Sequence, residues 1–216
     1  MSSFSVTLFL IMSDTFGVAV PMWWRNSASA CQSVGGRRSG PKAVLSRLMC
    51  PSNLTGYRPR PPTLVISAGG NDAGRQEGVL GEAVRSVAEG LGRIAAIRES
   101  FAREYRAMLD KAAGLDLPLA VCTIYDPRFS NPARRQVTLV ALAAFNDVIT
   151  REAFARGLAV IDLRLVCDQD ADFASPTGPS VQGGGKIAVA VARWATSPDP
   201  LRRRSEVFAS GGSSDR

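Results

Sequence analysis

The chain has no histidine among its 216 residues. The imidazole it lacks is the commonest general base in enzymes and the commonest metal ligand, so histidine-based catalysis is excluded. The four cysteines form no Cys-x-x-Cys pair, which excludes a zinc site, and we expect no metal and no other cofactor. Four cysteines are too few for a disulfide framework. Reduced thiols and a cytoplasmic location are therefore the expectation, while secretion stays open.

Long apolar stretches are also missing. No run of 18 apolar residues occurs, so a membrane span is not expected. The apolar run FSVTLFLIM, residues 4–12, has no positive charge before it and is followed by Ser13 and Asp14, which disfavours an export signal.

Acidic residues are scarce at the start of the chain. Residues 1–62 hold seven Lys/Arg and one acid, whereas residues 63–216 hold 19 Lys/Arg and 18 Asp/Glu. We place a boundary near Pro62 and predict three parts: a divergent or poorly ordered basic segment at 1–62 with a first strand at 5–12, an α/β domain at 63–196, and a flexible tail at 197–216. An alternative interpretation of the abrupt change is that residues 1–62 come from a mis-started or frame-shifted reading.

From residue 63 onward, strand and helix patterns alternate. We expect buried strands at 63–68, 117–126 and 158–166. We expect helices at 79–113, interrupted near Gly90 and Gly92, over an apolar pattern at 137–148 with Gly157 as the stop, and at 181–194. The second helix has an apolar stripe from Val137 and Val140 to Val148, and Ser180 is the predicted N-cap of the third. Strands separated by helices predict a three-layer α/β/α sandwich around a central parallel sheet.

The first strand runs into the turn Gly69-Gly70-Asn71-Asp72. In parallel sheets, the loops at the carboxyl ends of the strands form the functional edge. An Asn amide held there can donate a hydrogen bond to the negative oxygen that develops during acyl transfer. The alternative is that Asn71 and Asp72 only form an Asx turn that starts a helix.

Over about residues 63–194 the chain resembles the SGNH hydrolases, also called the GDSL family of esterases and lipases. VISAGGNDA, at 65–73, is similar to the family's Gly-x-Asn-Asp block, in which the Asn is an oxyanion donor, and that role falls on Asn71. Pro179, Ser180 and Gly183 match the last block, Asp-x-x-His-Pro-Ser/Asn-x-x-Gly. The resemblance implies the flavodoxin-like fold of the family and a small-molecule ester or acylated substrate.

The catalytic positions of the last and first blocks are degenerate. In this register the family's Asp and His correspond to Ser175 and Gly178, and the nucleophilic Ser of the Gly-Asp-Ser block corresponds to Thr15. A hydroxyl is a weak nucleophile without a base.

The sequence offers two possible replacements for the missing histidine base. Asp168, Asp170 and Asp172 could supply a carboxylate, although a solvated acidic loop is the favoured interpretation. Lys186 is the other substitute, but it lies inside the pattern of the last helix.

Two functions remain open. The first is an SGNH-type hydrolase for ester or acyl substrates with weak or lost activity; the second is an impaired relative that only binds an acyl or carbohydrate ligand. Nucleic-acid binding is disfavoured, because Arg37-Arg38 and Arg202-Arg203-Arg204 are short clusters without interleaved aromatic residues. The sequence does not indicate an oligomeric state.

Overall fold

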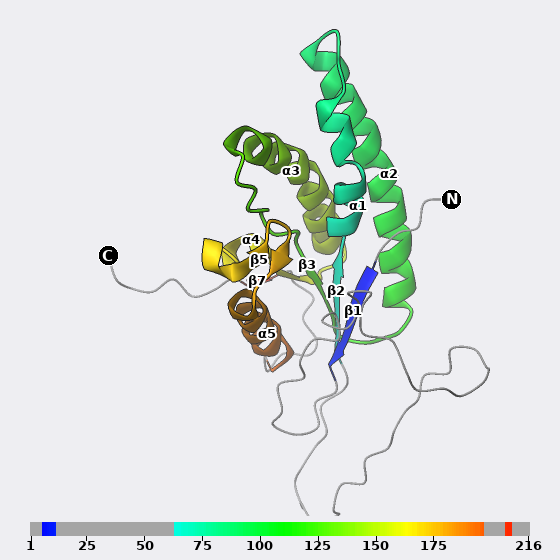
Figure 1. The fold of residues 1–216 in the computed structure, drawn as a ribbon. Coiled ribbons are helices and arrows are strands. Elements are labelled where there is room, and N and C mark those ends of the chain that lie inside the picture. Colours follow the sequence, from blue (N-terminus) through cyan, green and yellow to red (C-terminus); the bar gives the residue numbers. More distant parts are fainter. Residues whose placement is uncertain (1–5, 12–62, 197–205, 209–216) are drawn as a thin grey trace, which may run out of the picture.

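The computed structural model describes residues 6–11, 63–196 and 206–208, and for 6–11 it describes the main chain alone (Figure 1). Within these residues a five-stranded sheet has the order β1-β2-β3-β4-β7. The last four strands in this order run parallel to one another. The strands are β1 (Val6–Ile11), β2 (Thr63–Ala68), β3 (Leu119–Cys122), β4 (Ala159–Ile161) and β7 (Val207–Phe208). The α/β class is confirmed.

β1 departs from the expected parallel sheet. It lies within the predicted range 5–12 but pairs antiparallel with β2, with Val6 opposite Ala68 and Ile11 opposite Thr63. The sequence could not predict this direction, because the apolar pattern of a short strand is the same in either direction.

Helices connect the parallel strands. A short helix and a 3-10 turn follow β2, one long helix leads to β3, another leads to β4, and a hairpin and a last helix follow β4. These elements are α1 (Gly70–Arg75), η2 (Glu77–Gly81), α2 (Val87–Ala113), α3 (Pro132–Ala155), α4 (Leu163–Val166), η3 (Asp170–Asp172), β5 (Phe173–Ser175), β6 (Gly178–Pro179) and α5 (Val181–Ala195). Among the described helices, none has the length and apolar content needed to cross a bilayer.

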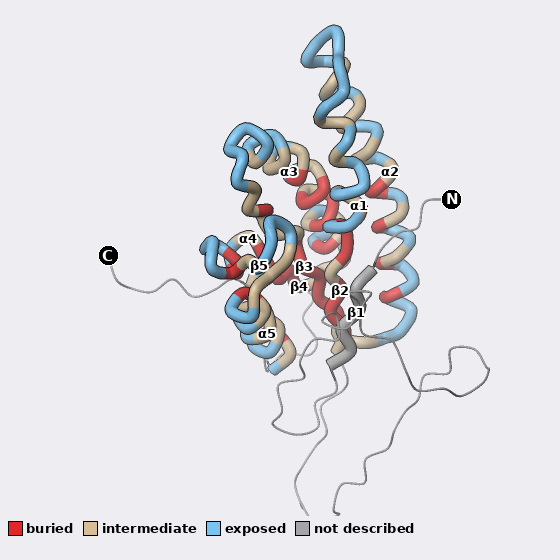
Figure 2. Tube along the Cα trace, in the orientation of Figure 1, coloured by how far each residue is buried: buried red, intermediate tan, exposed pale blue. Residues whose placement is uncertain are grey.

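Buried side chains form two clusters around the parallel strands. Figure 2 shows buried residues along β2 and β3 and on the helices beside them. Leu64 and Ile66 of β2 belong to the cluster that contains residues of α2 and α3. Val65, which lies between them, belongs to the cluster of α4 and α5 with Trp194. Successive side chains of a strand point to opposite faces, so helices cover both faces of β2.

The apolar stripe predicted for α3 is wrong in its first half. Val137 is 48% exposed and Val140 is 72% exposed, whereas Phe145 and Val148 are buried as predicted. The reason is length: 24 helical residues span about 36 Å, whereas the four residues of β3 span about 13 Å. Only the second half of α3 therefore has a strand to cover.

The ends of three other predicted elements also differ. The strand predicted at 117–126 is confined to Leu119–Cys122. α2 begins at Val87 and runs through Gly90 and Gly92 without a break, and its first half extends beyond the sheet at the top of Figure 1. The strand predicted at 158–166 ends at Ile161, because the Asp162 side chain accepts the Arg164 N–H and starts α4.

The flexible tail predicted at 197–216 is wrong for residues 207–208, which the structure describes as part of the sheet. Val207–Phe208 forms β7 and pairs in parallel with β4 at Val160 and Ile161. The Val160 N–H donates to the Glu206 carbonyl at 2.8 Å, and the Asp162 N–H donates to the Phe208 carbonyl at 2.9 Å. The free edge of β4 offers unpaired N–H and C=O groups, so this short apolar segment pairs with it even though the surrounding sequence is polar.

Candidate functional site

The turn after β2 places Asn71 at the carboxyl edge of the sheet. Gly69 is buried and has a left-handed φ of 107°, and a Cβ there would lie 2.9 Å from Cζ of Phe101 and 3.2 Å from Cδ1 of Ile124. Only glycine fits both conditions. The chain then turns into α1, where Gly70 and Asn71 are the first two residues and both are exposed.

The alternative, in which Asn71 and Asp72 form an Asx turn into a helix, agrees with the presence of α1 but not with its first residue. α1 begins at Gly70, before either residue, and no side chain caps it. One oxygen of Asp72 accepts a hydrogen bond from Arg75 at 3.0 Å. Its other oxygen is buried and has no hydrogen-bond partner within the described ranges.

A second group of side chains follows β3. The buried amide of Asn146, on α3, accepts the Ile124 N–H at 2.8 Å and donates to the Ile124 carbonyl at 3.0 Å, which holds the main chain at the strand end. Next comes the Tyr125 hydroxyl, which donates to the Thr177 carbonyl at 2.6 Å. Burial raises the pKa of Tyr125 to about 12, so this phenol stays protonated. Burial also raises the pKa of the neighbouring Asp126 carboxyl.

The end of β4 contributes a paired carboxylate. Asp162 is buried and accepts hydrogen bonds from Thr123 Oγ1 at 2.9 Å and from Arg164 Nε at 2.8 Å. Burial opposes ionisation of Asp162, but the bonds from Arg164 and Thr123 outweigh it, and the pKa is below its ordinary value. The hydrogen bond between Thr123 and Asp162 joins the ends of β3 and β4, so this carboxylate has a structural role.

The degenerate last block forms the β5–β6 hairpin and the start of α5. Ser175 and Gly178, which correspond to the family's Asp and His, lie opposite each other in the hairpin. A Cβ on Gly178 would lie 2.7 Å from Ser175 Oγ, so the serine hydroxyl occupies the space of a larger side chain. Pro179 ends β6. Ser180 is the N-cap of α5, as predicted, because its Oγ accepts the Gly183 N–H at 3.2 Å.

The acidic loop differs from its prediction. The side chains of Asp168 and Asp170 are 55% and 85% exposed, whereas Asp172 is fully buried. Lys186 Nζ lies 2.8 Å from Asp172 Oδ2 and 3.1 Å from Asp168 Oδ1, and these partners raise its pKa. Lys186 is therefore a charged structural partner and not a substitute base. The loop packs against α5, which buries Asp172 and leaves Asp168 and Asp170 in solvent. The cluster of acids in the sequence does not indicate which of them is buried.

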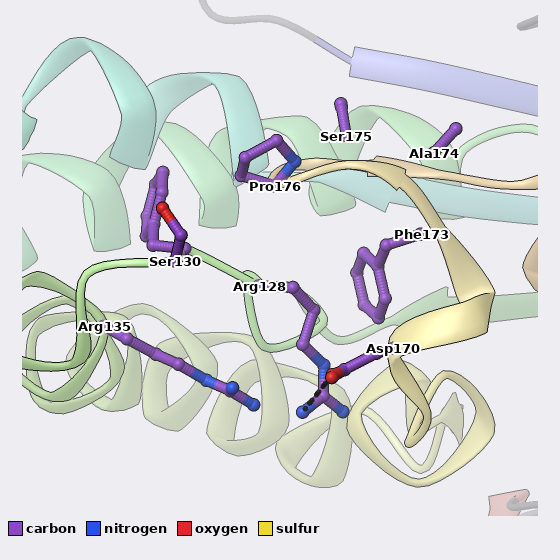
Figure 3. A pocket seen from close by; sticks show the side chains of 9 residues that line it. Arg128, Ser130, Arg135, Asp170, Phe173, Ala174, Ser175 and Pro176 are labelled. Atoms are coloured by element: carbon purple, nitrogen blue, oxygen red, sulfur yellow. Dashed lines mark ion pairs between the residues drawn. The ribbon is translucent and has the colours of Figure 1, made fainter.

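A hollow of about 490 Å³ lies between the hairpin and the start of α3 (Figure 3). Of the predicted site residues, Ser175 lines it and Asn71 does not; sequence reasoning missed its two arginines, which lie on different segments. Its lining residues are Arg128, Phe129, Ser130, Arg135, Asp170, Phe173, Ala174, Ser175 and Pro176. Thr15, the predicted nucleophile, lies outside the described residues. Within the described ranges, no group of three or more Cys, Asp or Glu residues is placed to hold a metal ion.

Comparison with known proteins finds no counterpart: no family model, no curated protein and no solved structure matches the chain.

Proposed function

We propose that the chain is an SGNH-type hydrolase with weak turnover of ester or acyl substrates, on a three-layer flavodoxin-like sandwich. The observation that carries the proposal is the position of Asn71. It is exposed on a glycine turn that directly follows a buried parallel strand, and Gly69 cannot be replaced without a clash. The helix clusters on both faces of β2 support the proposed layers.

In this proposal the Asn71 amide donates to the ester carbonyl oxygen. The oxygen becomes negative when a nucleophile attacks, so the donor stabilises the transition state more than the substrate. Removing one such donor lowers the rate by about 10²- to 10³-fold. Thr15 is the proposed nucleophile by its match to the family's Ser.

The missing imidazole limits the rate. No histidine exists anywhere in the sequence, so the Thr15 hydroxyl has no ordinary general base. Asp126 is the carboxylate best suited to replace it, because it follows β3 at the same edge and burial raises its pKa. A carboxylate with a raised pKa is a stronger base than an ordinary one.

The second candidate function is ligand binding without turnover. The pairing of Ser175 with Gly178 favours it, because these positions carry neither an acid nor a base. In this version the protein keeps the fold and binds an acyl or carbohydrate ligand.

Hydrolysis of p-nitrophenyl acetate and butyrate by the purified full chain distinguishes the two candidates. For the hydrolase we expect turnover above the buffer rate, a loss of about 10²-fold or more in Asn71→Ala, and no change in the control Gln76→Ala, an exposed residue at the end of the same helix. Thr15→Ala should abolish the activity, and Asp126→Asn should reduce it. Turnover that is absent, or equal in wild type and Asn71→Ala, would reject the hydrolase and leave the binding function.

A further inference from the structure

The hollow beside the β5–β6 hairpin is lined by more positive than negative side chains. Two guanidinium groups, Arg128 and Arg135, line it with a single carboxylate, Asp170. Both arginine side chains point into the same space in Figure 3. The lining charges therefore sum to a net positive site.

Arg128 is held in place by its main chain and by one edge of its guanidinium. Its N–H donates to the Pro176 carbonyl at 2.8 Å, its Nη2 donates to the Asp168 carbonyl at 2.6 Å, and its Cζ lies 5.4 Å from the centroid of the Phe173 ring. Its Nε is buried and has no hydrogen-bond acceptor among the described residues. Among the described residues, its Nη1 has only the ion pair with Asp170, at 3.5 Å, so the fixed guanidinium keeps N–H groups that can donate to an acceptor from outside the chain.

Asp170 does not neutralise this site. Its carboxylate is 3.5 Å from Nη1 of Arg128, longer than a hydrogen bond, and its side chain is 85% exposed. An exposed ion pair of this length contributes little.

Arg135 lies on the first turn of α3. Its guanidinium has no hydrogen bond or ion pair with any residue in the described part of the chain. Burial raises the pKa of Asp126, and the charges of Arg128 and Arg135 both act to lower it, but Asp126 forms no ion pair with either arginine. Two guanidinium groups that face a shared hollow repel each other, and an anion between them would replace that repulsion by two attractions.

We propose that this hollow binds the carboxylate or phosphate group of a small molecule, with Arg128 and Arg135 as its cationic partners. The Ser130 and Ser175 hydroxyls line the same hollow and supply further donors, while the Phe129 and Phe173 rings contact the apolar part of the ligand. The site requires no hydrolysis, so it is independent of the proposed function.

Three matched probes test the site by isothermal titration calorimetry on the full chain: phenylphosphonate, benzoate and the uncharged benzamide. We expect the anions to bind and benzamide not to bind. Raising NaCl from about 0.05 M to about 0.5 M should weaken binding of the anions through charge screening. Binding of phenylphosphonate alone would assign the site to phosphate groups, and binding of benzoate as well would extend it to carboxylates. Absence of binding by both anions, or equal binding of benzamide, would overturn the proposal.

Variants locate the binding in the hollow. Arg135→Gln should weaken binding by about tenfold or more, because it removes a charge-assisted hydrogen-bond donor. Its unfolding should be unchanged, since its guanidinium pairs with no described residue. Asp170→Asn should tighten binding, because it removes the competing carboxylate. Arg151→Gln, with the same charge change on the other half of α3, should bind as wild type does. An Arg135→Gln variant that binds as tightly as Arg151→Gln would place the anion elsewhere and reject the site.

Discussion

Lys186→Met should destabilise the protein through a buried carboxylate that loses its cationic partner. Asp172 is fully buried, and its side chain accepts hydrogen bonds from Lys186 Nζ at 2.8 Å, from the Gln169 N–H at 3.0 Å and from Gln182 Nε2 at 3.2 Å. Methionine keeps the length and the apolar stem of lysine and removes only the ammonium group.

The expected loss is about 2 to 3 kcal/mol at pH 7, smaller than the 3 to 5 kcal/mol of a fully buried pair because the Lys186 side chain is 28% exposed. For a folded part of this size, this corresponds to a fall of about 5 to 10 °C in the melting temperature. The control is Lys111→Met, an exposed lysine near the end of α2 that should change the stability by less than about 0.5 kcal/mol.

The pH dependence identifies the mechanism. In the wild type, burial acts to raise the pKa of Asp172, but the bonds from Lys186, the Gln169 N–H and Gln182 outweigh it and lower the pKa below the ordinary value of 3.8. The stability that this gives is present above pH 3.8 and is lost as the pH falls through the lower folded pKa. In Lys186→Met burial prevails, so the variant takes up a proton in the folded state and the loss of stability shrinks as the pH is lowered from 7 towards 4.

Urea unfolding at several pH values between about 4 and 8 measures this difference as two free energies of unfolding. The double variant Asp172→Asn/Lys186→Met, which removes both charges, should recover at least half of the loss at pH 7. The reasoning is refuted if Lys186→Met matches Lys111→Met at pH 7, or if its loss of stability does not change with pH.

Three other predictions concern tight packing and buried thiols. Gly183→Ala should cost about 3 kcal/mol or more in urea unfolding, because its Cβ would clash with the main-chain carbonyl oxygen of Asp172. Gly185→Ala, whose Cβ would have nothing within 4 Å, should instead stabilise the protein by roughly 0.5 to 1 kcal/mol. Gly69→Ala should cost about 1 to 3 kcal/mol from its left-handed backbone and its clash with a phenylalanine ring, and a loss below this range would contradict the turn geometry. Burial raises the pKa of Cys122 to about 12 and that of Cys167 to about 11, so iodoacetamide at pH 8 should leave both unmodified in the folded protein and modify both in urea, as read by peptide mass spectrometry.

Local signals in the sequence predicted the elements whose cause is local. The short apolar strand at 63–68 is β2, and the helix predicted from 181 to 194 is α5, with Ser180 as its cap. These features depend on neighbouring residues only: a run of branched apolar side chains, or a hydroxyl three residues before an unpaired N–H. Position after the strand also placed Asn71 at the carboxyl end of β2, although the predicted loop residue lies in the first turn of α1.

Features that depend on distant partners could not be predicted in this way. Val137 and Val140 continue an apolar stripe that the sequence presents as uniform, yet the sheet beneath α3 is too short to cover them. Asp172 carries the same carboxyl group as Asp168, but only Asp172 is buried beside Lys186.

The sequence by itself determined the alternation of strands and helices, the absence of an imidazole and the glycine turn before Asn71. Each of these follows from the identity or the local order of residues. Tertiary structure alone decided that β1 is antiparallel and that Arg128 and Arg135 face one hollow. The physical reason is that pairing direction, burial and charge proximity depend on which segments meet in space, and a residue's neighbours along the chain do not specify its neighbours in the fold.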